Sequence, residues 1–453
     1  MEATINIIGA GLAGSEAALQ LANRGINVRL FEMRPYLNTP VHQTSLCAEL
    51  VCSNSFKSTK AASAAGMLKH ELAQLDSFVL RCAYQNEVAA GGALAVDREH
   101  FSQDVTDLIE SHPQIELIRE EIVDIPTDAD AVLLASGPLT SDALTQAISK
   151  ITGSRSLSFF DAAAPIVMAD SLNLNTLFRQ SRYEEESGGD YLNAPFTKDQ
   201  YEAFIEKLCA ADRVILKEFE NKELFQACQP IEEIARKGLD APRYGTMKPV
   251  GLTDPNTGHR PWAAVQLRAE NTAQSSYNLV GFQTNLTFTE QARVFRMIPG
   301  LENADFVRYG VMHRNTFVDA PRILNHQLKL KTFSSFPIYI AGQLCGTEGY
   351  CEAIMSGLWA ALSIYASLTG QTMPLYPKST AFGSLLDYAV SDATLNYQPM
   401  HVNFGLLPPF EKRIRNKKER YEAYASRGAQ DFDRFIQALD DEELLLGNKE
   451  QAK

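Results

Sequence analysis

The sequence predicts an α/β fold that is interrupted by an α+β insertion, and three observations carry this prediction. Within the first 25 residues an apolar strand, a glycine-rich turn and an apolar helix follow one another. Two later segments, 131–137 and 338–349, repeat the order of buried strand and glycine turn. From about residue 190 to residue 330 the alternation of buried strand, glycine turn and helix is absent from the sequence. The insertion therefore divides the α/β domain into two parts.

The domain boundaries follow from these changes of pattern and from the length of the chain. A chain of 453 residues is too long for one ordinary hydrophobic core. We expect a first part of the α/β domain, an α+β insertion, a second part of the α/β domain, and a charged helical tail. Their predicted ranges are 1–189, 190–329, 330–435 and 411–453.

Composition and charge restrict the class of protein. A hydrophobic content of 45% and a charged content of 21% are those of a soluble globular protein. We identify no signal peptide and no apolar run long enough to span a membrane, so we expect a cytoplasmic protein. The net charge of −13 excludes a protein that coats nucleic acid through bulk charge. A local basic groove remains compatible with it.

The turn after the first strand carries the strongest signal of function. It has the spacing Gly-x-Gly-x-x-Gly, and the second strand ends in an acid. Such a turn lets the backbone approach a diphosphate at a helix N-terminus, and the acid accepts hydrogen bonds from a ribose. We predict dinucleotide binding; the alternative is a glycine-rich turn used only for packing. The predicted binding residues are Gly9, Ala10, Gly11, Leu12, Ala13, Gly14 and Glu32.

The two later glycine turns indicate which dinucleotide to expect. Taken singly, "AVLLASG" at 131–137 and "IYIAGQLCGTEG" at 338–349 fit any buried strand followed by a turn. Together with the first turn they favour FAD, because glycine-lined strand ends beside the first nucleotide fold suit the flavin. A second Gly-x-Gly-x-x-Gly is missing, so a separate NAD domain is not expected. We therefore predict a Rossmann-like, glutathione-reductase-like FAD domain, with Gly342 and Gly349 as further binding residues.

The insertion has its own local signals. "TKDQYEAFIEKL" reads as a helix with Thr197 as its N-cap and Tyr201, Phe204, Ile205 and Leu208 on one face. The Asp-Pro-Asn-Thr-Gly sequence at 254–258 reads as a turn between extended segments, and "SSYNLVGFQTNLTF" reads as a further strand.

The chain has seven cysteines, and some of them are candidates for reactive thiols while others are candidates for packing residues. An odd number without regular spacing favours reduced thiols over a disulfide framework. No two Cys or His pairs have metal-ligand spacing, so no metal is expected. Cys52 precedes Ser-Asn-Ser and fits either a packing residue at a strand end or a thiol held for chemistry. Cys228 lies at a loop-to-helix junction, where a reactive thiolate and a buried structural cysteine both fit.

Several blocks of the sequence, read together, resemble one family. They include "GAGLAGSEAA", "ELVCSNSFKS", "NEVAAGGALAVDREHFS", "CQPIEEIARKG", "GTMKPVGLTDPNTGHRP", "VFRMIPGLENADFVRYGVMHRNTF", "AGQLCGTEGY" and "NFGLLPP". The blocks span nearly the whole chain in one order. On these residues the chain is identified as a member of the folate- and FAD-dependent tRNA (uracil-5-)-methyltransferase family.

The resemblance implies a reaction and its partners. Members of this family methylate C5 of the T-loop uridine at position 54 of tRNA. The one-carbon unit comes from 5,10-methylenetetrahydrofolate, and the electrons come from FAD that NADPH or NADH has reduced. Thiolate addition at C6 makes uracil C5 nucleophilic, and a base then removes the C5 proton.

The same resemblance assigns roles to residues. It implies that Cys228 is the covalent nucleophile and that Cys52 is the second catalytic thiol, a candidate proton acceptor. It places Tyr350 against the flavin ring, and Arg34 and Lys57 are weaker candidates for phosphate or folate contacts. The basic stretch 412–420 is either an RNA contact or a solvated helix face. Further basic residues of the insertion are expected near the RNA, at positions 236, 237, 243, 248 and 260.

Three other functions remain open at this stage. The first is the same chemistry on a ribosomal RNA uridine. The second is the related flavoprotein that modifies the anticodon wobble uridine, although its helical C-terminal extension is longer than the tail here. The third is a flavin-bearing RNA-binding or chaperone protein without methyl transfer. The sequence does not indicate an oligomeric state.

Overall fold

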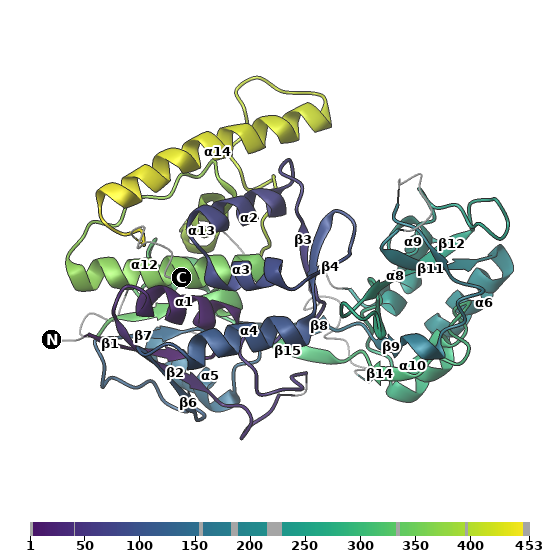
Figure 1. Ribbon diagram of the computed structural model, residues 1–453, viewed down its shortest axis with the longest axis horizontal. Helices are drawn as coiled ribbons and strands as arrows, with labels where there is room; N and C mark the ends of the chain where they lie inside the picture. Colours follow the sequence, from purple (N-terminus) through teal and green to yellow (C-terminus); the bar gives the residue numbers. More distant parts are fainter. Residues whose placement is uncertain are drawn as a thin grey trace.

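The computed structural model describes residues 3–39, 41–153, 157–182, 189–214, 229–331, 336–394 and 397–446. Their helices and strands form two units, which lie side by side in Figure 1. The first unit contains both ends of the chain, and the second is built from the middle of it. A two-stranded antiparallel ribbon of β8 (Leu157–Ala162) and β15 (Met312–Phe317) connects them.

The first unit is organised around a five-stranded parallel sheet in the order β16-β7-β1-β2-β6. Its strands are β1 (Thr4–Ile8), β2 (Asn27–Glu32), β6 (Ile115–Arg119), β7 (Ala131–Leu134) and β16 (Ile338–Ile340). Every neighbouring pair is parallel. Parallel sheets are covered on both faces, which explains why β7 and β16 are buried along their whole length. The predicted Rossmann-like α/β fold is confirmed.

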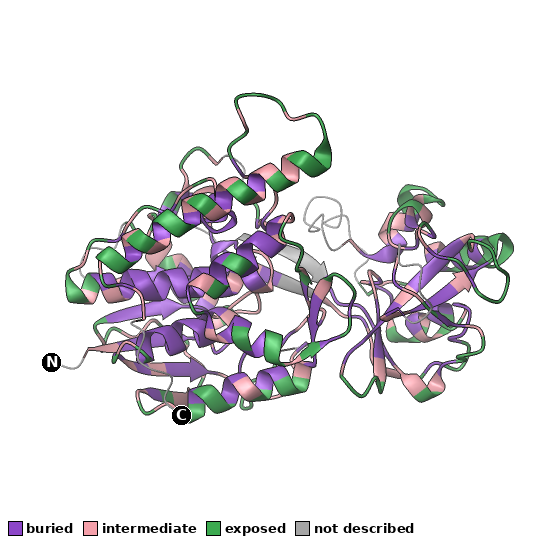
Figure 2. Ribbon diagram, turned by 45° about the horizontal axis from the view of Figure 1, so that its top comes forward, coloured by how far each residue is buried: buried purple, intermediate pink, exposed green. Residues whose placement is uncertain are grey.

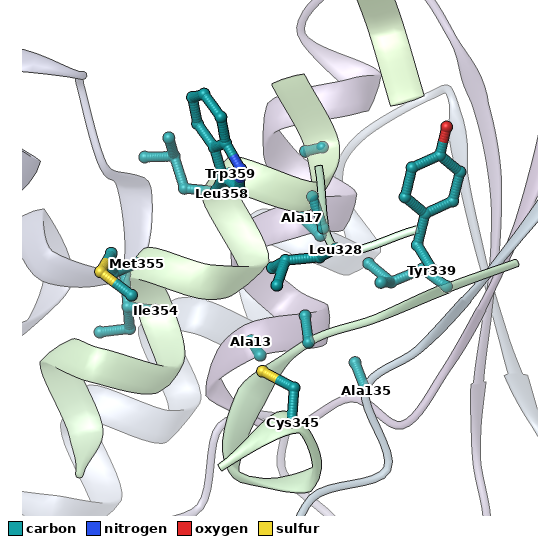
Figure 3. Packing of buried hydrophobic residues seen from close by; sticks show 14 of the residues in the cluster. Ala13, Ala17, Ala135, Leu328, Tyr339, Cys345, Ile354, Met355, Leu358 and Trp359 are labelled. Atoms are coloured by element: carbon teal, nitrogen blue, oxygen red, sulfur yellow. The ribbon is translucent and has the colours of Figure 1, made fainter. Parts of the chain in front are cut away.

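Helices from distant parts of the sequence pack on this sheet. Helix α1 (Leu12–Ala22) packs against α12 (Tyr350–Thr369), α3 (Phe78–Gln85) and α4 (Arg98–Glu110). Figure 3 shows the small side chains of Ala13 and Ala17 on α1, close to the chain around Cys345 and α12. Further helices of the unit are α2 (Ala64–Gln74), α5 (Asp142–Thr152), α11 (Ala320–Ile323) and α13 (Ala381–Val390). A small sheet of β3 (Ser55–Ser58), β5 (Ala93–Val96) and β4 (Glu87–Val88) extends toward the second unit.

Helix α12 differs from the expectation that no segment could span a membrane. It is long and apolar enough to do so by length and composition, but 78% of its apolar window is buried inside the protein. Trp359 at its centre is fully buried and contacts the rings of Tyr376, Phe382 and Phe435. Its apolar character therefore reflects its place in the core of the first unit.

The second unit is built on an antiparallel sheet in the order β10-β11-β12-β13-β9-β14. Its strands are β9 (Ile166–Met168), β10 (Phe178–Arg179), β11 (Tyr191–Phe196), β12 (Ala263–Ala269), β13 (Ser276–Leu279) and β14 (Phe306–Arg308). Among the described residues, its helices are α6 (Lys198–Ala210), α8 (Ile231–Lys237), α9 (Ala241–Tyr244) and α10 (Phe288–Phe295). The first strand of this sheet begins at Ile166, before the expected start of the insertion at residue 190. Its last strand ends at Arg308, before the expected end of the insertion at residue 329. Strands of two or three residues, such as β9 and β10, are too short to show a periodic pattern.

Local signals within the insertion match the structure well. Thr197 caps α6 and forms a reciprocal capping box with Gln200. The four residues predicted on one face of this helix are all buried. At the predicted turn, Gly258 has a φ of +70° and its N–H donates to Asp254 O at 2.8 Å.

The C-terminal helix α14 (Lys417–Asp441) crosses the top of the first unit (Figure 1). Figure 2 shows its exposed outer face and a buried stripe toward the unit. That stripe contains Tyr424, Gly428, Phe432, Phe435 and Leu439, and Phe432 contacts Phe382 of α13. The predicted charged tail is therefore part of the core on one face.

Replacing Phe432 with alanine should test this attachment. We expect the free energy of unfolding to fall by about 3–5 kcal/mol, because a buried aromatic side chain is removed and a cavity remains. Gln437→Ala, on the exposed face of the same helix, should change it by less than about 0.5 kcal/mol. Urea unfolding followed by circular dichroism measures both; equal effects would contradict the packing described.

Candidate nucleotide and cysteine site

A cleft with an empty volume of about 1000 Å³ lies where β1, β2 and β7 end and α1 and α12 begin. Ligands of open parallel sheets bind outside the carboxyl ends of the strands. The predicted binding residues that line it are Gly9, Gly11, Leu12, Ala13, Glu32, Gly342, Gly349 and Tyr350. Ala10 and Gly14, which were also predicted, stand behind this lining and support the turn.

The turn between β1 and α1 depends on two glycines. Gly9 has a φ of +103°, and a Cβ there would lie 2.6 Å from Ala135 O. A Cβ on Gly14 would lie 1.9 Å from Gly9 O, so only glycine allows the helix to start this close to the strand. Gly11, the N-cap of α1, supplies no side-chain cap. The first N–H groups of the helix therefore face the cleft as donors for an anion.

Glu32 stands at the end of β2 as a buried carboxylate. It accepts hydrogen bonds from Ala10 N (3.1 Å), Arg34 N (3.1 Å) and Arg34 Nε (2.9 Å). Burial alone would raise the pKa of Glu32, but the hydrogen bonds and charge of Arg34 hold it below its usual value. The carboxylate is therefore ionised and acts purely as an acceptor at the edge of the cleft.

Arg34 is more deeply placed than a phosphate contact would require. Its guanidinium lies between Glu32 and Glu49, with Arg34 Nη1 at 2.9 Å from Glu49 Oε2, and the side chain is 2% exposed. Lys57, the other weaker candidate, donates to Glu352 Oε1 at 3.0 Å.

His42 also lines the cleft, and burial together with the charge of Arg34 lowers its pKa to about 4. Its imidazole is therefore neutral at pH 7.

Tyr350 is the first residue of α12 and the link between the cleft and Cys52. Its ring packs against Phe56 with a centroid distance of 5.3 Å. Its hydroxyl accepts hydrogen bonds from Cys52 N (3.1 Å) and Ser53 N (3.2 Å) and donates to Ser53 O (2.7 Å). Tyr350 thus holds the backbone of the predicted catalytic cysteine through its hydroxyl while its side chain lines the cleft.

Two arginines hold the remaining carbonyl groups of the same loop. Arg98, the first residue of α4, donates to Leu50 O and, through Nη2 at 3.0 Å, to Cys52 O. Arg308, at the end of β14, donates to Val51 O at 2.8 Å and to Val41 O at 3.1 Å. We call residues 50–53 the cysteine loop. Together with Tyr350, the arginines bond the carbonyl of every residue in it.

The cysteine loop also lies at the contact between the units. Arg98 Nε is 2.5 Å from Glu270 Oε2, and Arg308 itself belongs to the second sheet. Asn54, fully buried, donates to Val96 O and Ala269 O and accepts from Arg268 Nε at 2.7 Å. A second cleft, with an empty volume of about 1610 Å³, opens between the units beside Leu50, Arg98 and Arg308.

The other described cysteines differ from Cys52 in their surroundings. Burial raises the pKa of Cys47, Cys345 and Cys351 to about 11 in each case. The same holds for Cys82, and burial also raises the pKa of Cys209. Cys47, Cys82, Cys345 and Cys351 are buried and suited to packing, whereas Cys52 and Cys209 are half-buried. Among the described residues, no group of three or more His, Cys, Asp or Glu could hold a metal ion.

Cys228 lies outside the described residues, so its predicted approach to Cys52 stays a prediction. The chain just after it is fixed: Ile231 N donates to Gln283 O, and α8 begins there. Glu232 accepts from Asn285 N at 2.7 Å and Thr284 Oγ1 at 3.0 Å. Burial raises the pKa of Glu232 to about 7.

These residues fit a flavin dinucleotide. The uncapped start of α1 offers donors for a diphosphate, Glu32 offers acceptors for a ribose, and Tyr350 offers an aromatic wall at the other end of the cleft. Sequence reasoning missed Glu49, Arg98 and Arg308. No sequence pattern marks them, because two of them act on backbone carbonyl groups.

Comparison with known proteins decides the family. The sequence model described as "Glucose inhibited division protein A" matches residues 4–372. The chain belongs to this family. A protein of Pelotomaculum thermopropionicum named "Methylenetetrahydrofolate--tRNA-(uracil-5-)-methyltransferase TrmFO" is 50% identical over 96% of this chain and 99% of its own length. A Bacillus velezensis protein of the same name is 49% identical over 94% of this chain and 96% of its own. The predicted resemblance to the folate-dependent tRNA methyltransferases is confirmed.

Solved structures agree at the level of the fold. The structure of Aquifex aeolicus GidA has a TM-score of 0.67 at 16% identity, covering 98% of this chain and 75% of that chain. A second crystal form of the same protein gives 0.68 at 17% identity. At this identity the likeness shows the shared fold alone.

Tyr350→Phe tests how the cysteine loop is held. The variant keeps the ring against Phe56 but loses the three hydrogen bonds of the hydroxyl, each worth about 1 kcal/mol. We expect amide hydrogen exchange in the peptide containing residues 50–54 to become several-fold faster. Tyr84→Phe, at a half-exposed ring on α3, should leave that exchange unchanged. Unchanged exchange in Tyr350→Phe would contradict the role given to the hydroxyl.

Proposed function

We propose that this protein methylates C5 of uridine in tRNA, taking the one-carbon unit from 5,10-methylenetetrahydrofolate with FAD as its cofactor. The observation that carries the proposal is identity of about half over nearly the full length to proteins named for this reaction. The nucleotide cleft and the adjoining cysteine loop add a physical basis for it. NADPH or NADH is the proposed reductant, and the cytoplasm is the proposed location.

The residues of the cleft have distinct proposed tasks. When bound, FAD supplies the electrons that convert the transferred methylene into a methyl group. The backbone from Gly9 to Gly14 holds the diphosphate, and Glu32 holds the ribose. Gly342, Gly349 and Tyr350 enclose the flavin end, where the aromatic wall keeps water away from the reacting carbon.

Two thiols carry the proposed chemistry on the base. Cys228 adds to C6 of uracil, which raises electron density at C5 and lets that carbon take up the one-carbon unit. Cys52 accepts the proton that C5 must lose before the Cys228–C6 bond breaks. The hydrogen bonds from Arg98, Arg308 and Tyr350 to the cysteine loop fix the backbone of Cys52 for this transfer.

The proposed target is the T-loop uridine at position 54. The names of the relatives specify tRNA and uracil C5, which favours this target over a ribosomal RNA uridine. The same names disfavour the wobble-uridine alternative, because relatives about 50% identical to this chain are named for methylation of uracil C5. A chaperone without methyl transfer predicts that Cys228 is dispensable.

The assay combines the purified holoenzyme, unmodified tRNA transcript, labelled methylenetetrahydrofolate and NADPH, followed by mapping of the labelled nucleotide. We expect label at uridine 54 only. No label with flavin-loaded protein, or label only in ribosomal RNA, would overturn the proposal.

The two catalytic assignments have their own variants. Cys228→Ala should abolish the covalent adduct with RNA and lower turnover by at least about 10³-fold, since the nucleophile is removed. Cys52→Ala should retain the adduct, because C6 addition does not need it, but lose turnover. Cys209→Ala, a half-buried cysteine on α6, is the control and should behave as wild type. A Cys228→Ala variant with normal turnover would show that the nucleophile is assigned wrongly.

A further inference from the structure

The chain carries an unusual concentration of exposed positive charge where α14 begins. Residues 411–420 contain six basic and two acidic side chains, in a protein whose net charge is −13. All but two of these ten residues are exposed. We call them the basic segment. Among the described residues, Lys412, Arg413, Arg415, Lys417 and Arg420 form no ion pair with a carboxylate.

Stability of the fold does not account for this arrangement. Lys417, Lys418 and Arg420 stand in the first turn of a 25-residue helix, where the positive end of the helix dipole disfavours cations. Lys417 and Arg420 lie over the ring of Tyr421, at 5.4 and 5.8 Å from its centroid. The buried residues of α14 begin at Tyr424, and Tyr421, one turn earlier, packs against the ring of Phe404. An external anion is the partner that these charges lack.

The second unit presents an aromatic and basic hollow of a different kind. Arg243, Tyr244, Lys248, Arg260 and Trp262 line a space with an empty volume of about 1110 Å³. The guanidinium of Arg243 lies 3.7 Å from the ring centroid of Trp262 and 5.6 Å from that of Tyr244. We call this set the stacking platform. Of the basic residues predicted here, Arg236 lies elsewhere and pairs with Glu233 at 2.6 Å.

Tyr244 makes this platform suited to a nucleobase. Its side chain is 75% exposed, although burial of such a ring would be favourable, so most of its surface is available for stacking. Bases stack on aromatic side chains and on guanidinium planes, and single-stranded RNA is recognised in this way. A surface that bound only phosphate groups would need basic side chains but no exposed aromatic ring such as that of Tyr244.

The elements that carry the basic segment and the stacking platform both lie in the upper part of the view in Figure 1. In Figures 1 and 2 the start of α14 reaches toward the second unit, and α9, which carries Arg243 and Tyr244, lies on the near upper side of that unit. The cysteine loop lies at the contact between the units. A ligand that contacts both surfaces therefore bridges the two units, as the contacts around the cysteine loop do.

We propose that one folded RNA is bound across both units, with its phosphates on the basic segment and an unpaired base on the stacking platform. The inference rests on the proposed function, because it takes the RNA substrate as the occupant. It adds two surfaces with different chemistry, and these differ in their response to salt. Phosphate binding releases counterions, so removing one basic side chain that binds a phosphate lowers the slope of log affinity against log salt by about 0.7–0.9. A stacked base changes affinity at every salt concentration alike.

The test measures binding of unmodified tRNA transcript by the holoenzyme between about 50 and 300 mM salt. Lys412→Gln/Arg413→Gln/Arg415→Gln should reduce the slope by about two to three, and its affinity at low salt should fall on the order of tenfold or more. The matched control is Lys150→Gln/Lys207→Gln/Arg322→Gln, which removes three exposed charges away from both surfaces. Its slope should stay that of the wild type. Equal slopes for the two triple variants would overturn the role of the basic segment.

A second variant separates stacking from charge. Tyr244→Ala should weaken binding on the order of tenfold at all salt concentrations with an unchanged slope. Tyr36→Ala, which removes an 81% exposed tyrosine from the loop after β2, is the control and should bind as wild type. Wild-type affinity in Tyr244→Ala would overturn the platform. These outcomes are read from binding: a wild-type enzyme that binds tRNA but methylates none of it refutes the proposed function instead.

Discussion

The site depends on how a short stretch of irregular backbone is hydrogen-bonded. Residues 50–53 belong to no helix or strand, yet Leu50 is buried and the next three residues are half-buried. Their peptide groups need partners, since an unpaired buried group costs about 1–3 kcal/mol. Arg98, Arg308 and Tyr350 supply those partners from α4, from β14 and from the start of α12. The position of Cys52 is thus set by three elements that lie far apart in the sequence and meet only in the folded chain.

Because Arg308 belongs to the second sheet, the conformation of the cysteine loop also depends on the position of the second unit. Glu270 holds Arg98 from the same unit, and Asn54 is bonded to Arg268 and Ala269 of β12. A rotation of the second unit would break charge-assisted hydrogen bonds that are largely buried, so it would be costly. On the other side, the chain after position 228 is held by Glu232 to residues 284 and 285 of the second unit. Both predicted catalytic cysteines are therefore next to segments whose geometry the second unit determines.

Sequence reasoning succeeded where the information is local and failed where it is not. The glycine turn, the position of Glu32 at the end of β2 and the capping box of Thr197 were predictable because a few neighbouring residues decide each of them. The start of the second sheet was not, because β9 and β10 are too short to show alternation, and β9 pairs with a strand about 100 residues away. Arg98 and Arg308 were not predictable either, since a backbone carbonyl leaves no mark in the sequence. The functional meaning of Cys52 came from the resemblance, and the structure adds how the loop around it is held.

The contacts that position Cys52 also shape its electrostatic surroundings. The proton transfer proposed for Cys52 would not suit a thiol in the environment of Cys47 or Cys345, where burial raises the pKa to about 11. Burial lowers the pKa of Arg308, the neighbouring Arg98 lowers it further, and Cys52 acts in the opposite direction. The interaction with Cys52 likewise raises the pKa of Arg98, so both guanidinium groups lie close enough to this cysteine to interact with it electrostatically. Both groups are fixed by their bonds to the loop carbonyls and, for Arg98, by Glu270. The hydrogen bonds that hold the backbone of the cysteine loop therefore also fix two positive charges beside Cys52, and fixed charges need no reorganisation during a reaction.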